Sequence, residues 1–274
     1  NAFVKASKQL KDNNWRKAAK SILTTDTKPK LLSALIRSGS KEIAITGFAK
    51  GSGMIRPDFA TLLSFVFIDA KLNKTLLESI HNEALAMSFN RITVDGDTSP
   101  NDSSILVASG KAKENIKKGS PIERKIRSSV IEIYKQLAEL LIKDAEGATK
   151  KITVKVMQAK TKEQAESVAF TVAESPLVKT AMFGNDANWG RILSAIGRSP
   201  EVNDVTKTSI YLNEVPLVKN GNLHPKHSES KSSKAIKKKN LIINIKLGLG
   251  ETSFSVLTSD FSEDYLLINS DYRS

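Results

Sequence analysis

The stretch GFAKGSGMIRPDFATLLSFVFIDA, residues 47–70, carries the chain from one apolar segment into another across a glycine-rich connection. The segment KEIAITGF, residues 41–48, alternates apolar and polar side chains, which predicts a strand leading into this connection. The glycines permit a tight backbone. At Ala60-Thr61 the sequence turns abruptly apolar, and the Thr61 hydroxyl at this junction needs an explanation.

Helical and strand patterns alternate on both sides of this stretch, which places the chain in the mixed α/β (α+β) class. Helices are predicted at residues 15–23, 73–89, 122–145, 162–174 and 188–198, and strands at 41–48, 104–109, 151–159, 208–215, 241–249 and 252–258. The strand at 104–109 is expected to be short and buried. Strands dominate after EGATK, so we expect a layered α/β domain over residues 1–150 and a smaller, β-rich α/β domain over 151–274.

The composition is that of an ordinary globular protein, with 274 residues of which 40% are hydrophobic and 26% charged. The absence of cysteine excludes disulfides, thiolate metal sites and a cysteine nucleophile. The apolar runs are far too short to span a bilayer, and the start lacks a signal-peptide pattern. We therefore expect a cytoplasmic protein without a membrane partner.

The net charge of +13 would suit a protein that binds polyanions. The charges are spread along the chain, however, and the one dense run is HSESKSSKAIKKKN at residues 227–240. This run lacks interleaved aromatic side chains and is typical of a solvated loop that enters a strand. Nucleic acid is therefore not an expected partner.

Several familiar motifs fail on inspection. The glycine-rich connection fits neither the dinucleotide-binding fingerprint nor a P-loop. The segment DGDTSPNDSSIL, residues 95–106, has calcium-loop residues at its first and third positions only, with Pro100 in place of the glycine and Leu106 in place of the closing glutamate. The histidines show no ligand spacing, and His81 is expected on a helix surface. No histidine is evident for a serine triad either.

Thr61 is the remaining candidate nucleophile. A threonine hydroxyl can act without histidine when the threonine is the first residue of a chain, because its own α-amino group then accepts the proton. An internal threonine reaches that state only if the preceding bond is cut, and the small Ala60 leaves that carbonyl accessible. On spacing alone, the favoured alternative is that Asp58 or Thr61 caps a helix starting at TLLSFVF.

The segment KGSGMIRPDFATLLSFVFIDA, residues 50–70, closely resembles the self-cleavage segment of the ornithine acetyltransferases, or glutamate N-acetyltransferases, of arginine biosynthesis. Further stretches resemble the same family in the same order: ILTTDTKPK from Ile22, SFNRITVDGDTSPNDS from Ser88, DAEGATKKITV from Asp144, SPLVKTAMFGNDANWGRILSAIGRS from Ser175, and the ending INSDYRS. The resemblance spans practically the whole chain.

The resemblance implies a layered, N-terminal-nucleophile-like fold that processes itself between Ala60 and Thr61 into two chains that stay associated. Thr61 would then take acetyl from N2-acetylornithine as an ester and deliver it to glutamate. The positions that contact substrate in the family correspond to Thr24, Lys50, Thr61, Glu146, Asn269 and Ser274. The last two imply that the tail of the chain returns to the active site.

These residue types suit substrates that are free amino acids. Lys50 would supply a cation for a carboxylate, and Glu146 an anion for an ammonium group. Without the resemblance, Lys50 would be an ordinary exposed residue at a strand end and Glu146 a solvated helix terminus. Asn188 is expected to cap the helix that carries Arg191, and the FGNDANWGR segment is given no catalytic role.

The resemblance implies no metal, nucleotide or redox cofactor, and it leaves open whether acetyl-CoA is a second acetyl donor. It also implies a homodimer of processed protomers. The family's oxyanion-forming Thr-Gly pair lies upstream of the segment matching Asn1, and Thr46-Gly47 belongs to a strand, so we expect this chain to lack an N-terminal part. The alternatives are a self-processing aminopeptidase of related fold, an inactive fragment and a basic binding protein.

Overall fold

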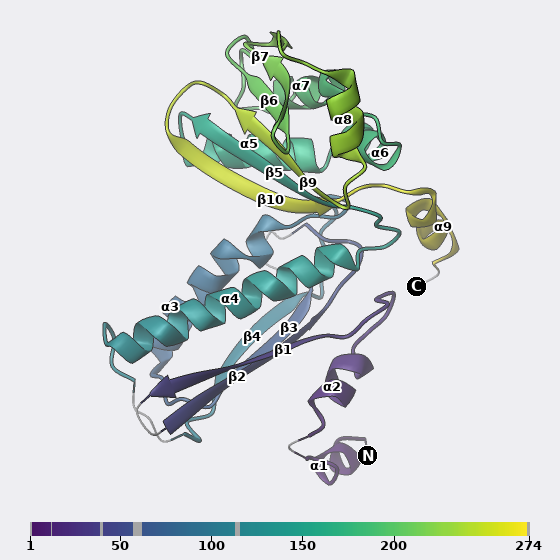
Figure 1. Ribbon diagram of the computed structural model, residues 1–274. Helices are drawn as coiled ribbons and strands as arrows, with labels where there is room; N and C mark the ends of the chain where they lie inside the picture. Colours follow the sequence, from purple (N-terminus) through teal and green to yellow (C-terminus); the bar gives the residue numbers. More distant parts are fainter. Residues whose placement is uncertain (1, 12, 39–40, 57–61, 113–115, 273–274) are drawn as a thin grey trace. The chain divides into compact units, whose positions relative to one another are not determined.

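The computed structural model describes residues 2–11, 13–38, 41–56, 62–112 and 116–272 (Figure 1). The chain forms two compact units: unit 1 comprises residues 1–52, 58–90 and 99–144, and unit 2 comprises 53–57, 91–98 and 145–274. In the described residues each unit is built on its own sheet, and the expected mixed α/β class is confirmed. The boundary was predicted at residue 150, whereas the units change at residue 145 and two short earlier segments join unit 2.

The sheet of unit 1 has the strand order β1-β2-β3-β4. Its strands are β1 (Lys30–Ser38), β2 (Lys41–Lys50), β3 (Leu63–Ile68) and β4 (Ser103–Ala108). β2 is antiparallel to β1 and β3, and β3 is parallel to β4. Along β3 the side chains alternate between half-buried and buried, as one-sided packing of a strand requires. A helix starting at TLLSFVF, the alternative explanation for Thr61, is therefore wrong.

Unit 1 also contains the helices α1 (Ala2–Ser7), α2 (Trp15–Ser21), α3 (Lys74–Met87), the 3₁₀ turn η1 (Phe89–Arg91, which ends in unit 2) and α4 (Pro121–Lys143). α4 packs on α3 and covers β1 and β2 (Figure 1). It buries the apolar stripe that its sequence predicts, from Ile126 to Leu141. A Cβ at Gly47 would stand 3.0 Å from Ile133 Cγ2, so this glycine lets β2 approach the helix closely. His81 is half-buried, and its Nδ1 lies 3.2 Å from the hydroxyl of Tyr134.

β4 is not the buried strand that its sequence predicts. Ile105 and Val107 are 44% and 37% exposed, whereas Leu106 between them is buried. The physical reason is that β4 is an edge strand that packs against a helix, α3, on one face only. A short apolar run is compatible with burial on one face or on both, and the sequence alone does not distinguish these cases.

The sheet of unit 2 has the order β10-β5-β9-β6-β7-β8. Its strands are β5 (Lys151–Ala159), β6 (Ser209–Leu212), β7 (Val215–Lys219), β8 (Asn222–Leu223), β9 (Asn240–Lys246) and β10 (Thr252–Ser259). Its helices are α5 (Lys162–Ala173), α6 (Pro176–Phe183), α7 (Trp189–Gly197), α8 (Glu229–Ile236) and α9 (Glu263–Asp271). α5 packs against β5 and β10, and α7 packs against α5, which encloses a core of Val, Ile and Ala side chains.

The prediction of a solvated loop at residues 227–240 is wrong, because this run contains α8. The Ser228 side chain accepts a hydrogen bond from the backbone N–H of Lys231 and caps the helix. Ser232, Ala235 and Ile236 are buried on one face at spacings of three and four residues. The lysines occupy the other face. The run therefore contains a short amphipathic helix, which its high charge made look like a loop in the sequence.

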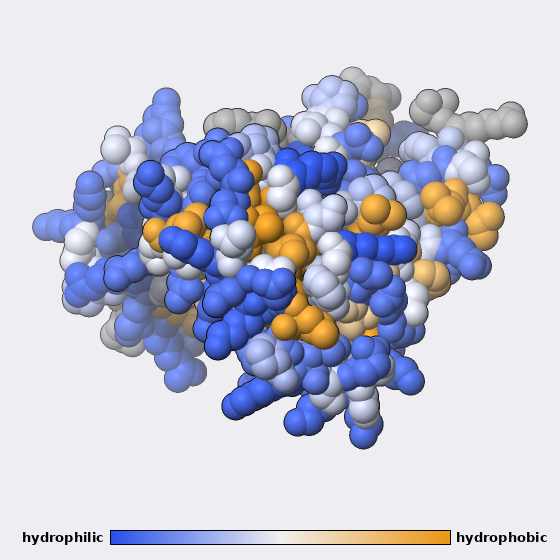
Figure 2. Space-filling model, turned by 90° about the horizontal axis from the view of Figure 1, so that it is seen from above, coloured by the Kyte–Doolittle hydropathy of each residue, from blue (hydrophilic) through white to orange (hydrophobic). Residues whose placement is uncertain are grey.

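None of the helices in the described ranges combines the length and the apolar character that crossing a membrane requires. Hydrophilic side chains cover most of the face drawn in Figure 2, with apolar patches between them.

Candidate active site

The site residues expected from the resemblance fall into three groups. Ala60, Thr61 and Ser274 lie outside the described residues. Thr24 and Lys50 belong to unit 1, and Glu146 and Asn269 to unit 2. Each unit is therefore described by itself.

In unit 1, the segment that contains Thr24 is organised around a buried lysine. The Lys30 side chain is 2% exposed and its ammonium forms ion pairs with Asp26 and, at 2.5 Å, with Asp144. Asp26 also accepts a hydrogen bond of 2.8 Å from the backbone N–H of Gly51, the residue after Lys50. Two carboxylates thus neutralise the buried ammonium, and one of them also fixes the backbone beside Lys50.

Asp144 has a second function in the same segment. It accepts hydrogen bonds from the backbone N–H groups of Thr27 and Lys28 at 3.0 and 3.2 Å, and one from the Thr27 hydroxyl. Burial acts to raise the pKa of Asp144, but the hydrogen bonds from Lys30 and Thr27 outweigh it and the pKa lies below its ordinary value. Asp144 therefore acts as an anion that holds the loop after Thr24.

Lys50 is the last residue of β2 and is half-buried. Its charge acts on Asp102, a residue of the motif SFNRITVDGDTSPNDS that the sequence analysis did not single out. Burial raises the pKa of Asp102, and a hydrogen bond with Ser99 and the positive charge of Lys50 oppose this only in part. The oxygen Oδ2 of Asp102 is buried without a hydrogen-bond partner among the described residues. An unpaired buried carboxylate oxygen near a lysine is typical of a functional site.

In unit 2, the structure brings Glu146 and Asn269 into contact. The amide nitrogen Nδ2 of Asn269, on α9, donates a hydrogen bond of 2.9 Å to Oε2 of Glu146. Glu146 itself is 9% exposed and stands just before Gly147, whose φ of +64° lies in the left-handed region. A Cβ at Gly147 would stand 2.4 Å from the backbone nitrogen of Tyr265, so only glycine allows α9 to approach this turn.

The turn that carries Glu146 is fixed by the residues that follow β10. The Ser262 hydroxyl donates a hydrogen bond to the carbonyl of Gly147, and Asp260 accepts hydrogen bonds from the backbone N–H groups of Thr149 and Lys150 at 2.9 and 2.8 Å. Asp260 is fully buried. The Glu146 carboxylate is therefore held by contacts that span more than 100 residues of sequence.

The FGNDANWGR segment has a structural function. Asn188 Oδ1 accepts a hydrogen bond of 3.1 Å from the backbone N–H of Arg191, which confirms the predicted helix cap. Asn185 accepts a 2.8 Å hydrogen bond from the ammonium of Lys150, which also donates to the carbonyl of Met182. The segment therefore accepts a hydrogen bond from the ammonium of Lys150, a buried lysine next to the turn that carries Glu146.

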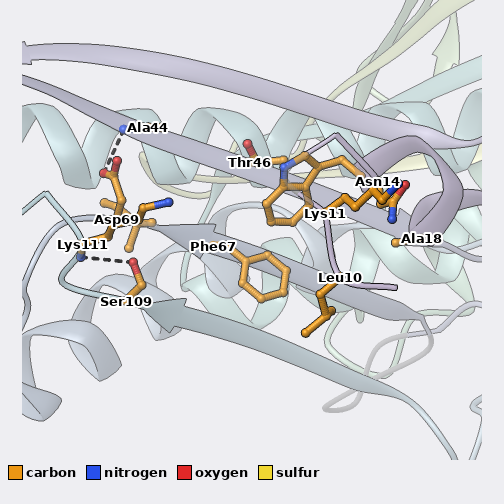
Figure 3. Close-up of a pocket in the computed structure, with 12 residues that line it drawn as sticks. Leu10, Lys11, Asn14, Ala18, Ala44, Thr46, Phe67, Asp69, Ser109 and Lys111 are labelled. Carbon is orange, nitrogen blue, oxygen red and sulfur yellow. Dashed lines mark hydrogen bonds between the residues drawn. The ribbon is translucent and has the colours of Figure 1, made fainter. Parts of the chain in front are cut away.

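A pocket lies elsewhere in unit 1, over β2 and β3 (Figure 3). It has a volume of about 760 Å³, and its lining includes Trp15 and Phe67, whose ring centroids are 5.2 Å apart. Asp69 at its edge accepts a 2.9 Å hydrogen bond from the backbone N–H of Ala44 (Figure 3). This pocket is not lined by Thr24, Lys50, Glu146 or Asn269, the expected site residues within the described ranges. The described residues also contain no cluster of histidine and carboxylate side chains that could hold a metal ion.

Comparisons with known proteins place the whole chain in a family. The model of the ArgJ family matches residues 1–274. The chain belongs to the ArgJ family. The arginine biosynthesis bifunctional proteins ArgJ of Psychrobacter arcticus, Pseudomonas fluorescens and Methylococcus capsulatus are 44%, 40% and 40% identical to it over 97%, 100% and 100% of its length. The resemblance inferred from the sequence motifs is thereby confirmed.

The chain spans about two thirds of the length of these ArgJ relatives, with 66%, 68% and 67% of each covered. Among solved structures, the arginine biosynthesis bifunctional protein argJ from Bacillus halodurans matches with a TM-score of 0.70 at 33% identity. That match covers 74% of this chain and 96% of the solved chain. The matched part of this α/β fold is therefore one that a family member also has.

Proposed function

We propose that the protein to which this ArgJ family chain belongs is a self-processing acetyltransferase of arginine biosynthesis. It moves an acetyl group from N2-acetylornithine to glutamate through an ester on Thr61. The observation that carries the proposal is the contact between Glu146 and Asn269, which are 123 residues apart in sequence and were both expected to bind substrate. Membership in the family supports the reaction class.

The chemistry begins with the precursor. The Thr61 hydroxyl attacks the carbonyl of Ala60, the peptide bond shifts to an ester, and water hydrolyses that ester to give a carboxylate on Ala60 and a free amine on Thr61. The new α-amine titrates near neutral pH and accepts the hydroxyl proton in the transfer reaction. The Thr61 oxygen then attacks the acetyl carbonyl of N2-acetylornithine, and ornithine leaves as its protonated amine. The amine of glutamate attacks the acetyl ester and restores the hydroxyl.

The charged residues distinguish the two ends of an amino-acid substrate. Lys50 binds a substrate carboxylate, and Glu146 binds a substrate ammonium group. Both side chains are at least partly shielded from water, which strengthens such contacts relative to an exposed pair. Thr24 and Ser274 complete the proposed substrate contacts.

The proposal includes no metal, nucleotide or redox cofactor. The proposal leaves open whether acetyl-CoA is a second acetyl donor. We expect acetyl transfer from N2-acetylornithine to be faster than any reaction with acetyl-CoA, because the proposed site residues bind a small amino acid. The proposed partners are small molecules, with neither nucleic acid nor membrane among them. The two cleaved chains stay together, two processed protomers form a dimer, and the enzyme works in the cytoplasm.

The test is an assay of the full-length gene product with N2-acetylornithine and isotope-labelled glutamate, with products identified by mass spectrometry. Labelled N-acetylglutamate and free ornithine in equal amounts are expected. Release of free acetate without N-acetylglutamate, or hydrolysis of a peptide panel in its place, would favour the self-processing aminopeptidase alternative.

A further inference from the structure

We propose that Gly53 is a positioning residue for the Glu146 carboxylate, and that Asp95 holds the turn that places Gly53 against it. The inference rests on the proposed function, in which Glu146 binds a substrate ammonium group. All of the residues involved belong to unit 2. Neither Gly53 nor Asp95 was among the substrate-binding residues expected from the sequence.

The Glu146 carboxylate occupies the space that a side chain at position 53 would fill. A Cβ built on Gly53 would stand 2.4 Å from Oε2, 2.7 Å from Cδ and 2.9 Å from Oε1 of Glu146. Carbon atoms do not approach non-bonded atoms so closely, so even alanine at this position would displace the carboxylate. The carboxylate is the far end of a flexible side chain, and its displacement costs the fold little. The same displacement removes the anion from its place in the site.

The carboxylate is also held by α9. Asn269 Nδ2 donates to Oε2 of Glu146 at 2.9 Å and also donates to the backbone carbonyl of Tyr265 at 2.9 Å. The carboxylate thus lies against both the backbone of Gly53 and the amide of Asn269. A charged group held in place by its neighbours is pre-organised for a ligand, since it loses little conformational freedom on binding.

Asp95 anchors both the turn after Gly53 and α9. Its carboxylate accepts hydrogen bonds of 2.7 and 2.9 Å from the backbone N–H groups of Met54 and Ile55, and one of 3.2 Å from the hydroxyl of Tyr265. Met54 has a φ of +52°, a left-handed conformation that a methionine adopts only when its surroundings impose it. Asp95 therefore imposes the turn after Gly53 and ties it to the helix that carries Asn269.

The experiment is a double-mutant cycle on the full-length enzyme, with KM and kcat for N2-acetylornithine measured on fully processed protein. Gly53→Ala should raise KM by about tenfold or more, because a contact with a charged group is lost. Its effect on the melting temperature should be small. In the Glu146→Ala background, where the space is empty, Gly53→Ala should have no further effect on KM.

Gly197→Ala is the matched control, because a Cβ at this position in α7 would make only an ordinary contact, 3.8 Å from Val205 Cγ1. It should leave KM unchanged. Asp95→Asn, which keeps one acceptor for the backbone N–H groups, is the second test should the alanine variant fail to fold. It should raise KM above the wild-type value, and an unchanged KM in folded Asp95→Asn would contradict the role given to Asp95.

The outcomes separate this inference from the proposed function. An unchanged KM in folded Gly53→Ala, or an equal rise in the wild-type and Glu146→Ala backgrounds, overturns the positioning role alone. A full-length wild-type enzyme that transfers no acetyl group overturns the proposed function and the inference with it.

Discussion

Lys50 stands at the end of a strand, where a lysine is ordinarily exposed and interchangeable with other polar residues. In this structure it is half-buried, and its charge acts on the half-buried carboxylate of Asp102. Lys219, at the end of β7, is an exposed strand-end lysine in the same chain. The two positions allow a direct comparison of the lysine proposed to bind substrate with an ordinary strand-end lysine.

Lys50→Ala should raise the KM for both substrates by about tenfold or more, because it removes a charge-assisted contact of about 1.5 to 3 kcal/mol with a substrate carboxylate. Lys219→Ala should leave both KM values unchanged. Steady-state kinetics of the two variants, with processing checked by gel electrophoresis, provide the comparison. Equal kinetics for the two variants would assign Lys50 to the ordinary strand-end lysines.

Lys179 is a second residue whose surroundings are unusual. Its side chain is 1% exposed, its ammonium donates to Thr258 Oγ1 at 2.8 Å and to the Ser259 carbonyl, and it lies 4.4 Å from the centre of the Phe261 ring. Burial lowers the pKa of Lys179 to about 7, and the charges of nearby carboxylates oppose this shift. An unfolded lysine keeps a pKa of 10.5.

The stability of the protein should therefore rise with pH above neutrality. Between about pH 7 and 10.5 the unfolded chain binds more protons at Lys179 than the folded chain does, so the free energy of unfolding increases, by up to about 1.4 kcal/mol per pH unit. Burial raises the pKa of Tyr134 and Tyr265, which lowers stability only above about pH 10. Urea denaturation between pH 7 and 9 should show the rise in the wild type and a smaller rise in Lys179→Met, since burial also lowers the pKa of Lys150. A rise of the same size in that variant would contradict the assignment.

At the scale of elements, the accuracy of the sequence predictions follows from length and periodicity. α4 was predicted nearly to its ends because six apolar residues recur on one face over 20 residues. β1, α6 and α9 were not predicted, because a polar segment or a proline obscured their short patterns. α8 was predicted as a loop because its lysines outweigh a buried face of three residues.

The residues of the candidate site were likewise predicted only in part. Thr24, Lys50, Glu146 and Asn269 were found through motifs, whereas Asp26, Lys30, Asp95 and Asp102 were not. The function of the missed residues depends on partners far away in sequence: the Lys30–Asp144 pair, for example, spans 114 residues. The sequence offered one indication that these four missed residues matter: all of them lie in stretches that resemble the family.

The buried face of α8 predicts a difference between two neighbouring variants. Ile236→Ala should lower the free energy of unfolding by about 2 to 5 kcal/mol, since it leaves a cavity in the core of unit 2. Lys234→Ala, on the exposed face, should change it by no more than about 0.5 kcal/mol. Thermal and urea unfolding measure both. Equal, small effects would mean that residues 227–240 form the solvated loop expected from their charge.

At the scale of the whole molecule, the two units share a chain that crosses between them several times. Residues 53–57 and 91–98 belong to unit 2 although the residues on either side belong to unit 1. The peptide bond between Ala60 and Thr61 lies three residues beyond the end of the first of these segments in the sequence. Cutting it would separate residues 1–60, which contribute to both units, from residues 61–274.

The most direct test of the account is the fate of that bond in the full-length protein, measured by intact mass and N-terminal sequencing of wild type, Thr61→Ala and Thr61→Ser. The account predicts a new chain beginning at Thr61 in the wild type, partial processing in Thr61→Ser, which keeps a hydroxyl, and one uncut chain without acetyl transfer in Thr61→Ala. Processing of Thr61→Ala at the same bond, or acetyl transfer by an uncut wild-type enzyme, would contradict it.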